Sequence, residues 1–358
     1  MDPWHYPRPE LANAYLDAFG LGLTSARGLF ARRRMGKTEF LCKDLLPAAV
    51  ERGILVAYTN LWDTSTPDIA LVSALAEALE PRGLSAVLAA LGKPVRKIKA
   101  SAKIPGGVEG SIEAELAQLH AESSATMREV LRQLDRQKMP LVLVIDEAQV
   151  LAKAEHSTFA HALRAALDIR KERIKVVFAG SSETTLRGMF ARSSEPFYNW
   201  APLEPFPLLG EEFVAFTIDR MNSMARHTLT LAQGKRAFEE LHRTPEFFKR
   251  FVERFMLYQT QGVDAAIEHT KESVFSDAHF LKQWSAINPA DQAVLTLLAN
   301  GDSDLHSVSG MERLTTLTGR AATRNTAAHA LRRLQDGNVV TRLGVGQYRI
   351  EDEAYAEW

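Results

Sequence analysis

The chain has 358 residues, of which 46% are hydrophobic and 24% charged, and its formal net charge is -1. This composition is that of an ordinary globular protein, and the near-neutral charge excludes a whole-molecule field that would attract nucleic acid. The length predicts two or three domains.

The N-terminal segment and the cysteine content bear on the compartment. Residues 1–9 are polar and proline-rich without the apolar core of a signal peptide, and no uninterrupted apolar run approaches the length of a bilayer span. The single cysteine, Cys42, has no partner for an intramolecular disulfide, which is typical of a reducing compartment. We therefore expect a cytoplasmic, soluble protein with no membrane partner.

A phosphate-binding loop follows the short apolar stretch 28–30. Its motif consists of eight consecutive residues: Ala31, Arg32, Arg33, Arg34, Met35, Gly36, Lys37 and Thr38. The segment 39–50, beginning at Glu39, is predicted to be a helix, which completes the strand, loop and helix that the motif requires. In such a site backbone N–H groups and the positive helix end hold the β- and γ-phosphates of ATP, Lys37 adds a charge, and the Thr38 hydroxyl binds Mg²⁺.

Two features of this loop leave alternatives open. Ala31 stands where the motif usually has glycine, and its Cβ restricts the turn that glycine permits. Arg32, Arg33 and Arg34 either neutralise phosphates or anchor the loop to an acidic neighbour, and the residues alone favour neither.

Strands and helices alternate along the chain as far as about residue 207. Strands are predicted over 53–59, 140–146 and 174–179, and helices over 68–79, about 114–137 and 158–171. Such alternation predicts an α/β fold with a parallel sheet covered by helices on both faces. Ligands of such sheets bind at the carboxyl ends of the strands.

The segment 95–116 interrupts this alternation. Apolar residues there are separated by charged and small ones around a Pro-Gly-Gly sequence, which predicts a β-hairpin or a flexible insertion. Five basic residues lie in or beside it: Lys93, Arg96, Lys97, Lys99 and Lys103. They form either a surface for a partner or nucleic acid, or a solvated face.

The strand over 140–146 ends in two acidic residues within the sequence Asp-Glu-Ala-Gln. Asp146 is expected to hold Mg²⁺, through water, and Glu147 to polarise the water that attacks the γ-phosphate. Lys37 and Glu147 are therefore candidate catalytic residues, and Thr38 and Asp146 are candidate metal ligands.

Two further units are expected after the sheet. The segment 211–274 is predicted to be helical throughout, with many phenylalanines on its apolar faces, and to form a lid beside the nucleotide. Helices over 289–298, 310–317 and 323–334, followed by two strands around Gly344-Val345-Gly346, predict a winged helix. We therefore divide the chain into an ATPase core (1–207), a helical lid (208–280) and a winged helix (281–358).

The third helix of a winged helix enters the major groove of DNA. This would expose Arg324, Asn325 and His329 to bases and place Arg342 along the backbone. The basic residues of this unit are Arg320, Arg324, Arg332, Arg333 and Arg342. The alternative is a module for protein contacts or autoinhibition.

These motifs resemble those of the AAA+ ATPases of the archaeal branch, close to the STAND signalling ATPases and to the archaeal origin-recognition initiators. The resemblance rests on the Gly36-Lys37-Thr38 loop, on the acidic strand, on the strand that ends in Ser181-Ser182, and on a lid followed by a winged helix. It implies a P-loop NTPase sheet of the AAA+ type that binds ATP with Mg²⁺. A homo-oligomer or a protein partner is a further implied possibility.

The resemblance also implies roles for single residues. Ser181 or Ser182 matches the sensor of the γ-phosphate, although a serine at this point also caps a helix. Arg8 matches a segment that packs against adenine, and Pro245 a lid position near the nucleotide, with Arg243 in place of the family's glycine. The segment 196–200 lacks the arginine of related chains, so an arginine finger would be Arg187 or Arg192, or be missing.

Two functions are compatible with this sequence. The first is an ATP-dependent switch that hydrolyses ATP and changes the exposure of a winged helix that binds double-stranded DNA. The second is a signalling or assembly scaffold that holds ATP with little turnover and uses the winged helix for protein contacts.

Overall fold

The computed structural model describes residues 2–62, 66–79, 127–274, 277–302, 304–337, 339–344, 346–351 and 355–356. The segment 95–116, its basic residues and the first half of the helix expected over 114–137 lie outside these ranges. From residue 127 to residue 137 the chain is helical, as expected.

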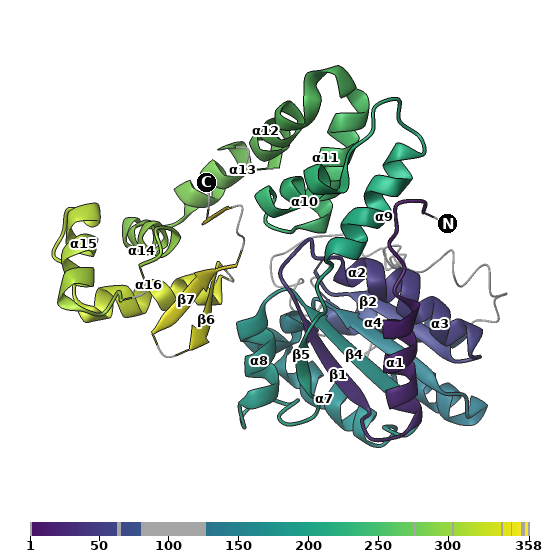
Figure 1. The fold of residues 1–358 in the computed structure, drawn as a ribbon. Coiled ribbons are helices and arrows are strands. Elements are labelled where there is room, and N and C mark those ends of the chain that lie inside the picture. The colour runs from purple at the N-terminus through teal and green to yellow at the C-terminus, as the bar shows by residue number, and fades with distance from the viewer. Residues whose placement is uncertain are drawn as a thin grey trace, which may run out of the picture.

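A five-stranded parallel sheet forms the N-terminal part of the molecule (Figure 1). Its strands are β1 (Ala26–Phe30), β2 (Leu55–Asn60), β3 (Leu141–Asp146), β4 (Ile174–Gly180) and β5 (Leu203–Pro205). Their order is β2-β3-β4-β1-β5, and every neighbouring pair is parallel. Every residue of β3 is buried, because a continuous apolar run suits a central strand covered on both faces. The predicted parallel α/β sheet is confirmed.

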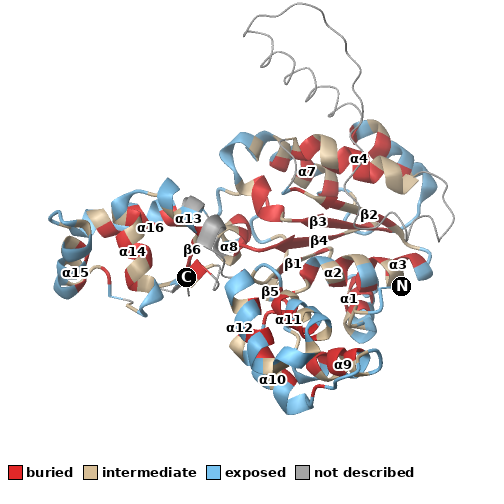
Figure 2. Cartoon of the chain, turned by 90° about the horizontal axis from the view of Figure 1, so that it is seen from above, coloured by how far each residue is buried: buried red, intermediate tan, exposed pale blue. Residues whose placement is uncertain are grey.

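Helices cover both faces of this sheet (Figure 2). One face buries apolar residues of α4 (Pro67–Leu79), the helix over 127–137, α7 (Ser157–Asp168) and α8 (Glu183–Ala191). The other face is covered by α1 (Pro9–Gly20) and by the helix that follows the phosphate-binding loop. That helix consists of α2 (Lys37–Phe40), a π-helical segment η1 (Leu41–Leu45) and α3 (Leu46–Glu51).

Three short elements were not expected from the sequence. Two 3₁₀ turns, η2 (Ala148–Ala152) and η3 (Ala154–His156), join β3 to α7, and β5 is only three residues long. A three-residue strand shows too few alternations to leave a periodic signal. The 12-residue helix α1 was also missed; it begins at Pro9, in the proline-rich N-terminal segment.

The segment after the sheet is a helical unit, but it is interrupted. Its helices are α9 (Glu211–Asn222), α10 (Leu231–Glu240), α11 (Pro245–Leu257), α12 (Gly262–Val274) and α13 (Asp277–Ala286), with a 3₁₀ turn η4 (Gln259–Gln261). Non-helical segments separate α9 from α10 and α10 from α11, so the expectation of helix throughout was too simple. The phenylalanines form the core, as expected: Phe213, Phe238, Phe248, Phe251 and Phe255 are all buried.

The C-terminal unit contains three helices and a two-stranded antiparallel sheet. These elements are α14 (Pro289–Ala299), α15 (Val308–Thr318), α16 (Arg324–Asp336), β6 (Val340–Gly344) and β7 (Gln347–Ile350). The unit shares one continuous apolar core with the helical unit, and the rings of Phe280 and Tyr355 stack at 5.3 Å. Helix α13 runs through residue 280, where the sequence had been divided.

The C-terminal unit also meets the sheet domain. Strand β6 packs against α8, and Figures 1 and 2 both show the two elements side by side. Among the helices of the described ranges, none is long and apolar enough to cross a bilayer.

Candidate nucleotide-binding site

The phosphate-binding loop connects the carboxyl end of β1 to α2. Two of its residues have left-handed backbone angles, Arg34 (φ 67°) and Gly36 (φ 83°). Glycine adopts this region without strain, whereas an arginine there is uncommon and is held by the surrounding structure. The backbone therefore bends sharply just before α2, at the N-terminal end of a helix, where an anion binds.

Lys37 lies inside this loop and is only 7% exposed to solvent. Its Nζ donates hydrogen bonds to the carbonyl oxygens of Ala31 (2.5 Å) and Arg32 (3.2 Å). Burial lowers the pKa of Lys37, while the nearby carboxylates of Glu147 and Asp146 act in the opposite direction. The loop thus holds a desolvated ammonium group beside the two acidic residues of β3.

The hydroxyl of Thr38 donates a 2.6 Å hydrogen bond to Oδ2 of Asp146, which is 1% exposed. The hydroxyl of Tyr58, on β2, donates to the same oxygen at 3.2 Å. Burial raises the pKa of Tyr58, and the charge of Asp146 raises it further. Tyr58 therefore stays a donor and holds the Asp146 carboxylate in place.

Thr38 and Asp146 fit a site for Mg²⁺. A hydroxyl and a carboxylate facing each other beside a phosphate-binding loop are the hard oxygen ligands that this cation prefers. In the part of the chain that the structure describes, no group of three His, Cys, Asp or Glu residues could hold a metal. Phosphate oxygens and water would complete the coordination of a bound Mg²⁺, as is usual for this cation.

Glu147 follows Asp146 with a left-handed backbone (φ 54°). Its Oε2 accepts hydrogen bonds from Nε2 of Gln149 (2.5 Å) and from Oγ of Ser181 (2.8 Å). A Cβ at Gly180 would lie 2.5 Å from Oε1 of Gln149, so only glycine leaves room for the amide. A positive φ in a residue other than glycine costs about 1–3 kcal/mol, which points to a functional constraint at Glu147.

The two candidate sensor serines have different surroundings. Ser181 contacts Glu147 and Gln149 at the carboxyl end of β4. Ser182 caps α8, because its Oγ accepts from the backbone N–H of Thr185 at 3.4 Å. Ser182 therefore caps the helix, whereas Ser181 contacts Glu147 and stays the candidate for the sensor.

Arg8 anchors the N-terminal segment to the phosphate-binding loop. Its guanidinium donates to the carbonyl oxygens of Pro207 (3.0 Å) and Gly36 (3.5 Å) and lies over the rings of Phe40 and Phe206. Burial lowers the pKa of Arg8, against the charge of Asp44. A residue that touches the backbone of Gly36 is well placed to respond to whatever the loop binds.

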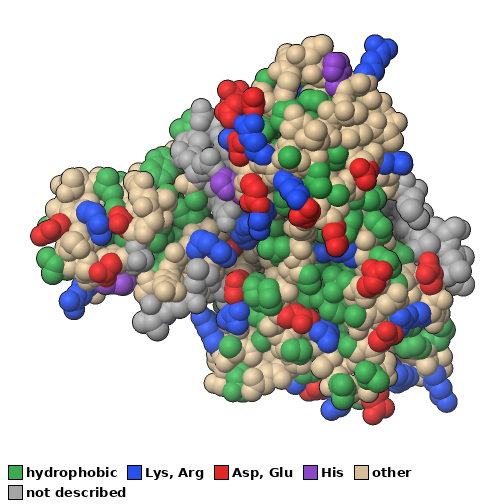
Figure 3. All heavy atoms as spheres, viewed as in Figure 1, with side chains coloured by type: hydrophobic (Ala, Val, Ile, Leu, Met, Phe, Trp, Pro, Cys, Tyr) green, Lys and Arg blue, Asp and Glu red, His purple; other side chains and the backbone are tan. Residues whose placement is uncertain are grey.

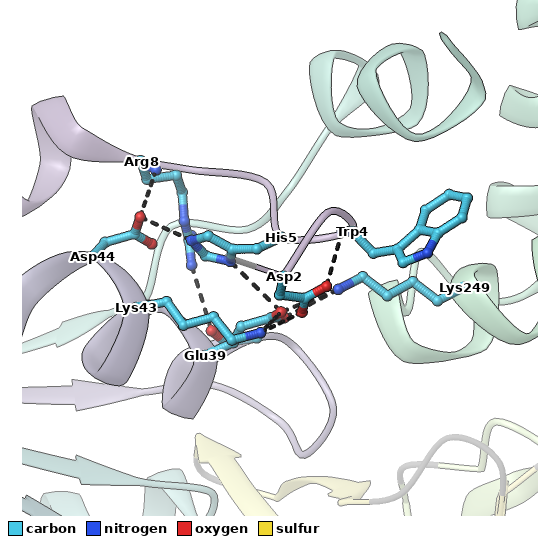
Figure 4. A network of polar contacts seen from close by, with 9 residues as sticks. Asp2, Trp4, His5, Arg8, Glu39, Lys43, Asp44 and Lys249 are labelled. Atoms are coloured by element: carbon cyan, nitrogen blue, oxygen red, sulfur yellow. Dashed lines mark hydrogen bonds and ion pairs between the residues drawn. The ribbon is translucent and has the colours of Figure 1, made fainter. Parts of the chain in front are cut away.

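Glu39, a predicted nucleotide contact, lies in a network of ion pairs (Figure 4). Its carboxylate meets Lys43 at 2.7 Å, Lys249 at 3.2 Å and His5 at 3.5 Å. Burial would raise the pKa of Glu39, but the hydrogen bonds from His5 and Lys43 outweigh it and hold the pKa well below its usual range. Since Lys249 belongs to α11, this network ties the phosphate-loop helix to the helical unit.

The remaining loop residues also contact neighbouring elements. The guanidinium of Arg33 lies 4.2 Å from the centre of the Trp62 ring. That of Arg34 approaches Glu246 (3.6 Å) and the ring of Phe247, directly after Pro245 at the start of α11.

Met35 is buried in the loop, and Arg32 accepts from Lys37 through its backbone carbonyl. Pro245, the predicted lid position near the nucleotide, begins α11. The contacts of Arg34 place the first turn of this helix beside the phosphate-binding loop. The structure thus brings Ala31 to Glu39, Asp146, Glu147, Ser181 and the start of α11 together.

Arg192 lies apart from this group, at the end of α8. Its guanidinium folds over Gly188 and lines a cavity of about 810 Å³ together with Trp62, Gln149 and Arg332. Arg187, the other candidate finger, pairs with Glu183 at 2.7 Å and lies 5.4 Å from the centre of the Phe30 ring.

Sequence reasoning missed three residues of this site. Tyr58 was included only as part of a β-run, Gln149 only as the last letter of the acidic motif, and Lys249 not at all. The spacing of Glu147 and Gln149 was the available signal for Gln149, since a turn directly after a strand can fold one side chain back on another. Nothing in the local sequence of α11 marks Lys249.

Comparisons with known proteins identify the fold. No protein-family model matches the chain, and no curated protein matches it. Among solved structures, the Walker-type ATPase Paby2304 of Pyrococcus abyssi aligns with a TM-score of 0.65 and 16% identity, covering 98% of this chain and 94% of that one. The ORC2 protein of Aeropyrum pernix in its ADP form aligns with a TM-score of 0.57 and 13% identity, covering 96% and 88%. The chain therefore has the fold of an AAA+ P-loop ATPase similar to the archaeal origin-recognition proteins.

Proposed function

We propose that this protein binds ATP with Mg²⁺ and acts as a nucleotide-controlled switch. One observation carries the proposal: the Thr38 hydroxyl and the Asp146 carboxylate, 108 residues apart in sequence, meet at 2.6 Å beside a buried lysine. A packed core does not need two polar groups and an ammonium there, because each costs free energy to bury. A phosphate site does need them.

Each residue of the loop has a defined task in this proposal. Backbone N–H groups of the loop and the N-terminal end of α2 bind the phosphates, and Lys37 turns its Nζ from the carbonyls of Ala31 and Arg32 to phosphate oxygens. A bound Mg²⁺ supplies Lewis-acid stabilisation of the phosphate charge. Thr38 and Asp146 hold it, and Tyr58 keeps the Asp146 carboxylate in orientation.

Hydrolysis depends on Glu147. A carboxylate that accepts from Gln149 and Ser181 is held by protein donors, so it must exchange one of these bonds for a water molecule before it can polarise the water. Ser181 is then the residue that senses the γ-phosphate. Arg192 or Arg187 would supply an arginine finger to a neighbouring copy in a homo-oligomer.

The C-terminal unit is proposed to be a winged helix that binds double-stranded DNA. Its three helices and antiparallel hairpin follow the expected order, and Arg324, Asn325 and His329 are exposed along α16. Arg333 differs from these residues, because its guanidinium donates hydrogen bonds to the carboxylate of Asp291 on α14. The division at residues 207 and 280 and the cytoplasmic location remain predictions.

The alternative function is a scaffold that holds ATP with little turnover and uses the C-terminal unit for protein contacts. The engaged state of Glu147 favours slow turnover, so this alternative rests on an observation as well. The switch and the scaffold differ in whether DNA changes the rate of ATP turnover.

The test is a measurement of mass and of ATP turnover, with and without double-stranded DNA, on the full chain. The switch predicts that DNA binds, that ATP changes its affinity, and that DNA raises turnover. An ATP-bound protein whose turnover and mass are indifferent to DNA would support the scaffold. A protein that binds neither ATP nor ADP would contradict both.

A further inference from the structure

The C-terminal hairpin approaches the phosphate-binding site. Strand β6 packs against α8, the helix that starts just after the candidate sensor residue Ser181. Figures 1 and 2 show the hairpin beside the carboxyl ends of the sheet strands, and Figure 3 shows Lys and Arg side chains near this junction. The hairpin is therefore close to the one edge of the sheet where a ligand is expected.

The residue that follows β7 is Glu351. Its backbone N–H continues the hairpin by donating to the carbonyl oxygen of Val339 at 2.9 Å. Its carboxylate oxygen Oε1 is buried, and no group of the described chain donates a hydrogen bond to it. A buried carboxylate oxygen without a donor costs free energy, so the position demands an explanation.

The charges that surround Glu351 come from the sheet domain as well as from its own strand. Arg33 of the phosphate-binding loop and Arg349 of β7 attract its carboxylate, while Glu183 of α8 repels it. The same carboxylate acts on the ammonium of Lys37. Burial raises the pKa of Glu351 to about 6, although the hydrogen bond with Thr341 lowers it. An acidic group from the end of the chain thus lies within electrostatic range of the loop's own cations.

We propose that, where the hairpin is docked in this way, the Glu351 carboxylate occupies the field that Lys37 and Arg33 create for the γ-phosphate, and that binding of ATP displaces the hairpin. This inference rests on the proposed ATP binding and names the residue that makes the C-terminal unit respond to it. The physical reason is repulsion: a carboxylate and a triphosphate cannot both share the same two cations at short range.

The same docking places the C-terminal end of α16 beside the sheet domain. Arg332 and Gln335 line the 810 Å³ cavity together with Trp62, Gln149 and Arg192 of the sheet domain. Asn325, His329 and Arg332 are spaced by four and three residues, so they lie on one face of α16. The C-terminal end of the face that the DNA hypothesis requires therefore lies at the sheet domain, while Arg324, Asn325 and His329 are exposed.

The first experiment compares nucleotide affinity between matched variants of the full chain. Glu351→Gln removes the competing charge and keeps the shape, whereas Glu312→Gln removes an exposed acid from α15 of the same unit. Calorimetric titration with Mg²⁺ and ATP should show that Glu351→Gln binds roughly tenfold more tightly than the parent, while Glu312→Gln binds like the parent. The affinity for ADP, which lacks the γ-phosphate, should increase less than the affinity for ATP in Glu351→Gln.

The second experiment follows the hairpin itself. Spin labels at Glu155→Cys and Glu312→Cys, in a Cys42→Ala background, report the distance between the sheet domain and the C-terminal unit. The distance should lengthen when Mg²⁺ and ATP are added to the labelled parent, should stay short when Lys37→Ala is included, and should be long without nucleotide in Glu351→Gln.

The outcomes separate this inference from the proposed function. If the parent binds ATP, but Glu351→Gln leaves the affinity and the distance unchanged or weakens binding, the displacement mechanism is wrong and ATP binding stands. If neither the parent nor Glu351→Gln binds ATP, the proposed function and this inference fall together.

Discussion

The hydroxyl of Thr38 donates to Oδ2 of Asp146 at 2.6 Å, across 108 residues of sequence. This bond joins the first turn of α2, the helix that follows β1, to the end of β3. Strands β1 and β3 are not neighbours in the order β2-β3-β4-β1-β5, because β4 lies between them. The phosphate-binding loop must therefore arch over the end of β4 to reach Asp146. Ser181 follows β4, and because β4 pairs with β3, Ser181 lies beside Glu147 and contacts it.

Glu147→Gln should retain ATP binding and lose hydrolysis. The amide keeps the size of the side chain but cannot accept a proton from the attacking water, and removing a general base typically costs about 10²- to 10⁴-fold in rate. Phosphate release and calorimetric titration measure the two properties on one preparation. Glu155→Gln, an exposed acid on η3, is the control. Turnover at the parent rate in Glu147→Gln would remove Glu147 from the mechanism.

Ser181→Ala and Ser182→Ala should separate sensing from capping. Loss of the cap at Ser182 should lower the free energy of unfolding by about 1 kcal/mol, because the N–H of Thr185 loses its acceptor. Ser181→Ala should change turnover more than stability, since its hydroxyl contacts Glu147. Urea unfolding and phosphate release measure both. If the two variants exchanged these effects, the assignment of the sensor would be reversed.

The central sheet could be predicted because each signal there is local and strong. The run 140–145 is apolar and is followed directly by Asp146, and the loop motif is contiguous, so the strand, loop and helix followed from short-range sequence. The strand order also brings both motifs to one edge, which is why Thr38, Asp146 and Glu147 were placed together correctly.

The contacts that were missed depend on residues far apart in sequence. Glu39 is a predicted nucleotide contact because it follows Thr38, but its ion pairs with His5 from the N-terminus and Lys249 from α11 were not predicted. Periodicity describes one element at a time and contains no information on which charged residue of a distant helix will meet it. Glu351 was missed for the same reason.

The network around His5 should make stability depend on pH. Burial would lower the pKa of His5, but hydrogen bonds with Asp44 and Glu39 raise it from 6.5 to about 9. Because the folded pKa is raised, the stabilisation is fully present below 6.5 and is lost as the pH rises toward 9. His5→Gln should therefore be less stable than the parent at low pH, with a difference that shrinks between these values.

Urea unfolding of the parent and of His5→Gln across this pH range measures that difference. His227→Gln, at an exposed position of the helical unit, controls for the loss of a histidine. A difference between parent and His5→Gln that stayed constant with pH would show that His5 does not titrate with the network.

Arg324→Ala combined with Arg342→Ala should weaken DNA binding at every sequence tested. Each lost phosphate contact lowers the slope of log affinity against log salt by about one unit, so the double variant should lose up to about two. Asn325→Ala or His329→Ala should instead relax sequence preference at a similar slope. Fluorescence titrations of the full chain at several salt concentrations, with and without ATP, measure both.

The control for this pair is Arg220→Ala with Arg226→Ala, two exposed arginines of the helical unit. An equal loss of affinity in the control pair would place the DNA elsewhere. A parent that does not bind duplex DNA at low salt, with or without ATP, would assign the C-terminal unit to protein contacts.

The most direct test of the account is calorimetric titration of the full chain with Mg²⁺ and ATP, for the parent, Lys37→Ala and the exposed-lysine control Lys153→Ala. Among the described residues, Lys37 donates hydrogen bonds only to two loop carbonyls, so its removal should leave the circular dichroism spectrum and the thermal unfolding close to those of the parent. The parent and Lys153→Ala should bind one nucleotide, and Lys37→Ala should bind at least about a hundredfold more weakly, as expected for a lost charge-assisted contact. Equal affinity in Lys37→Ala and the parent, or no binding in the parent, would contradict the assignment of this loop as the phosphate site.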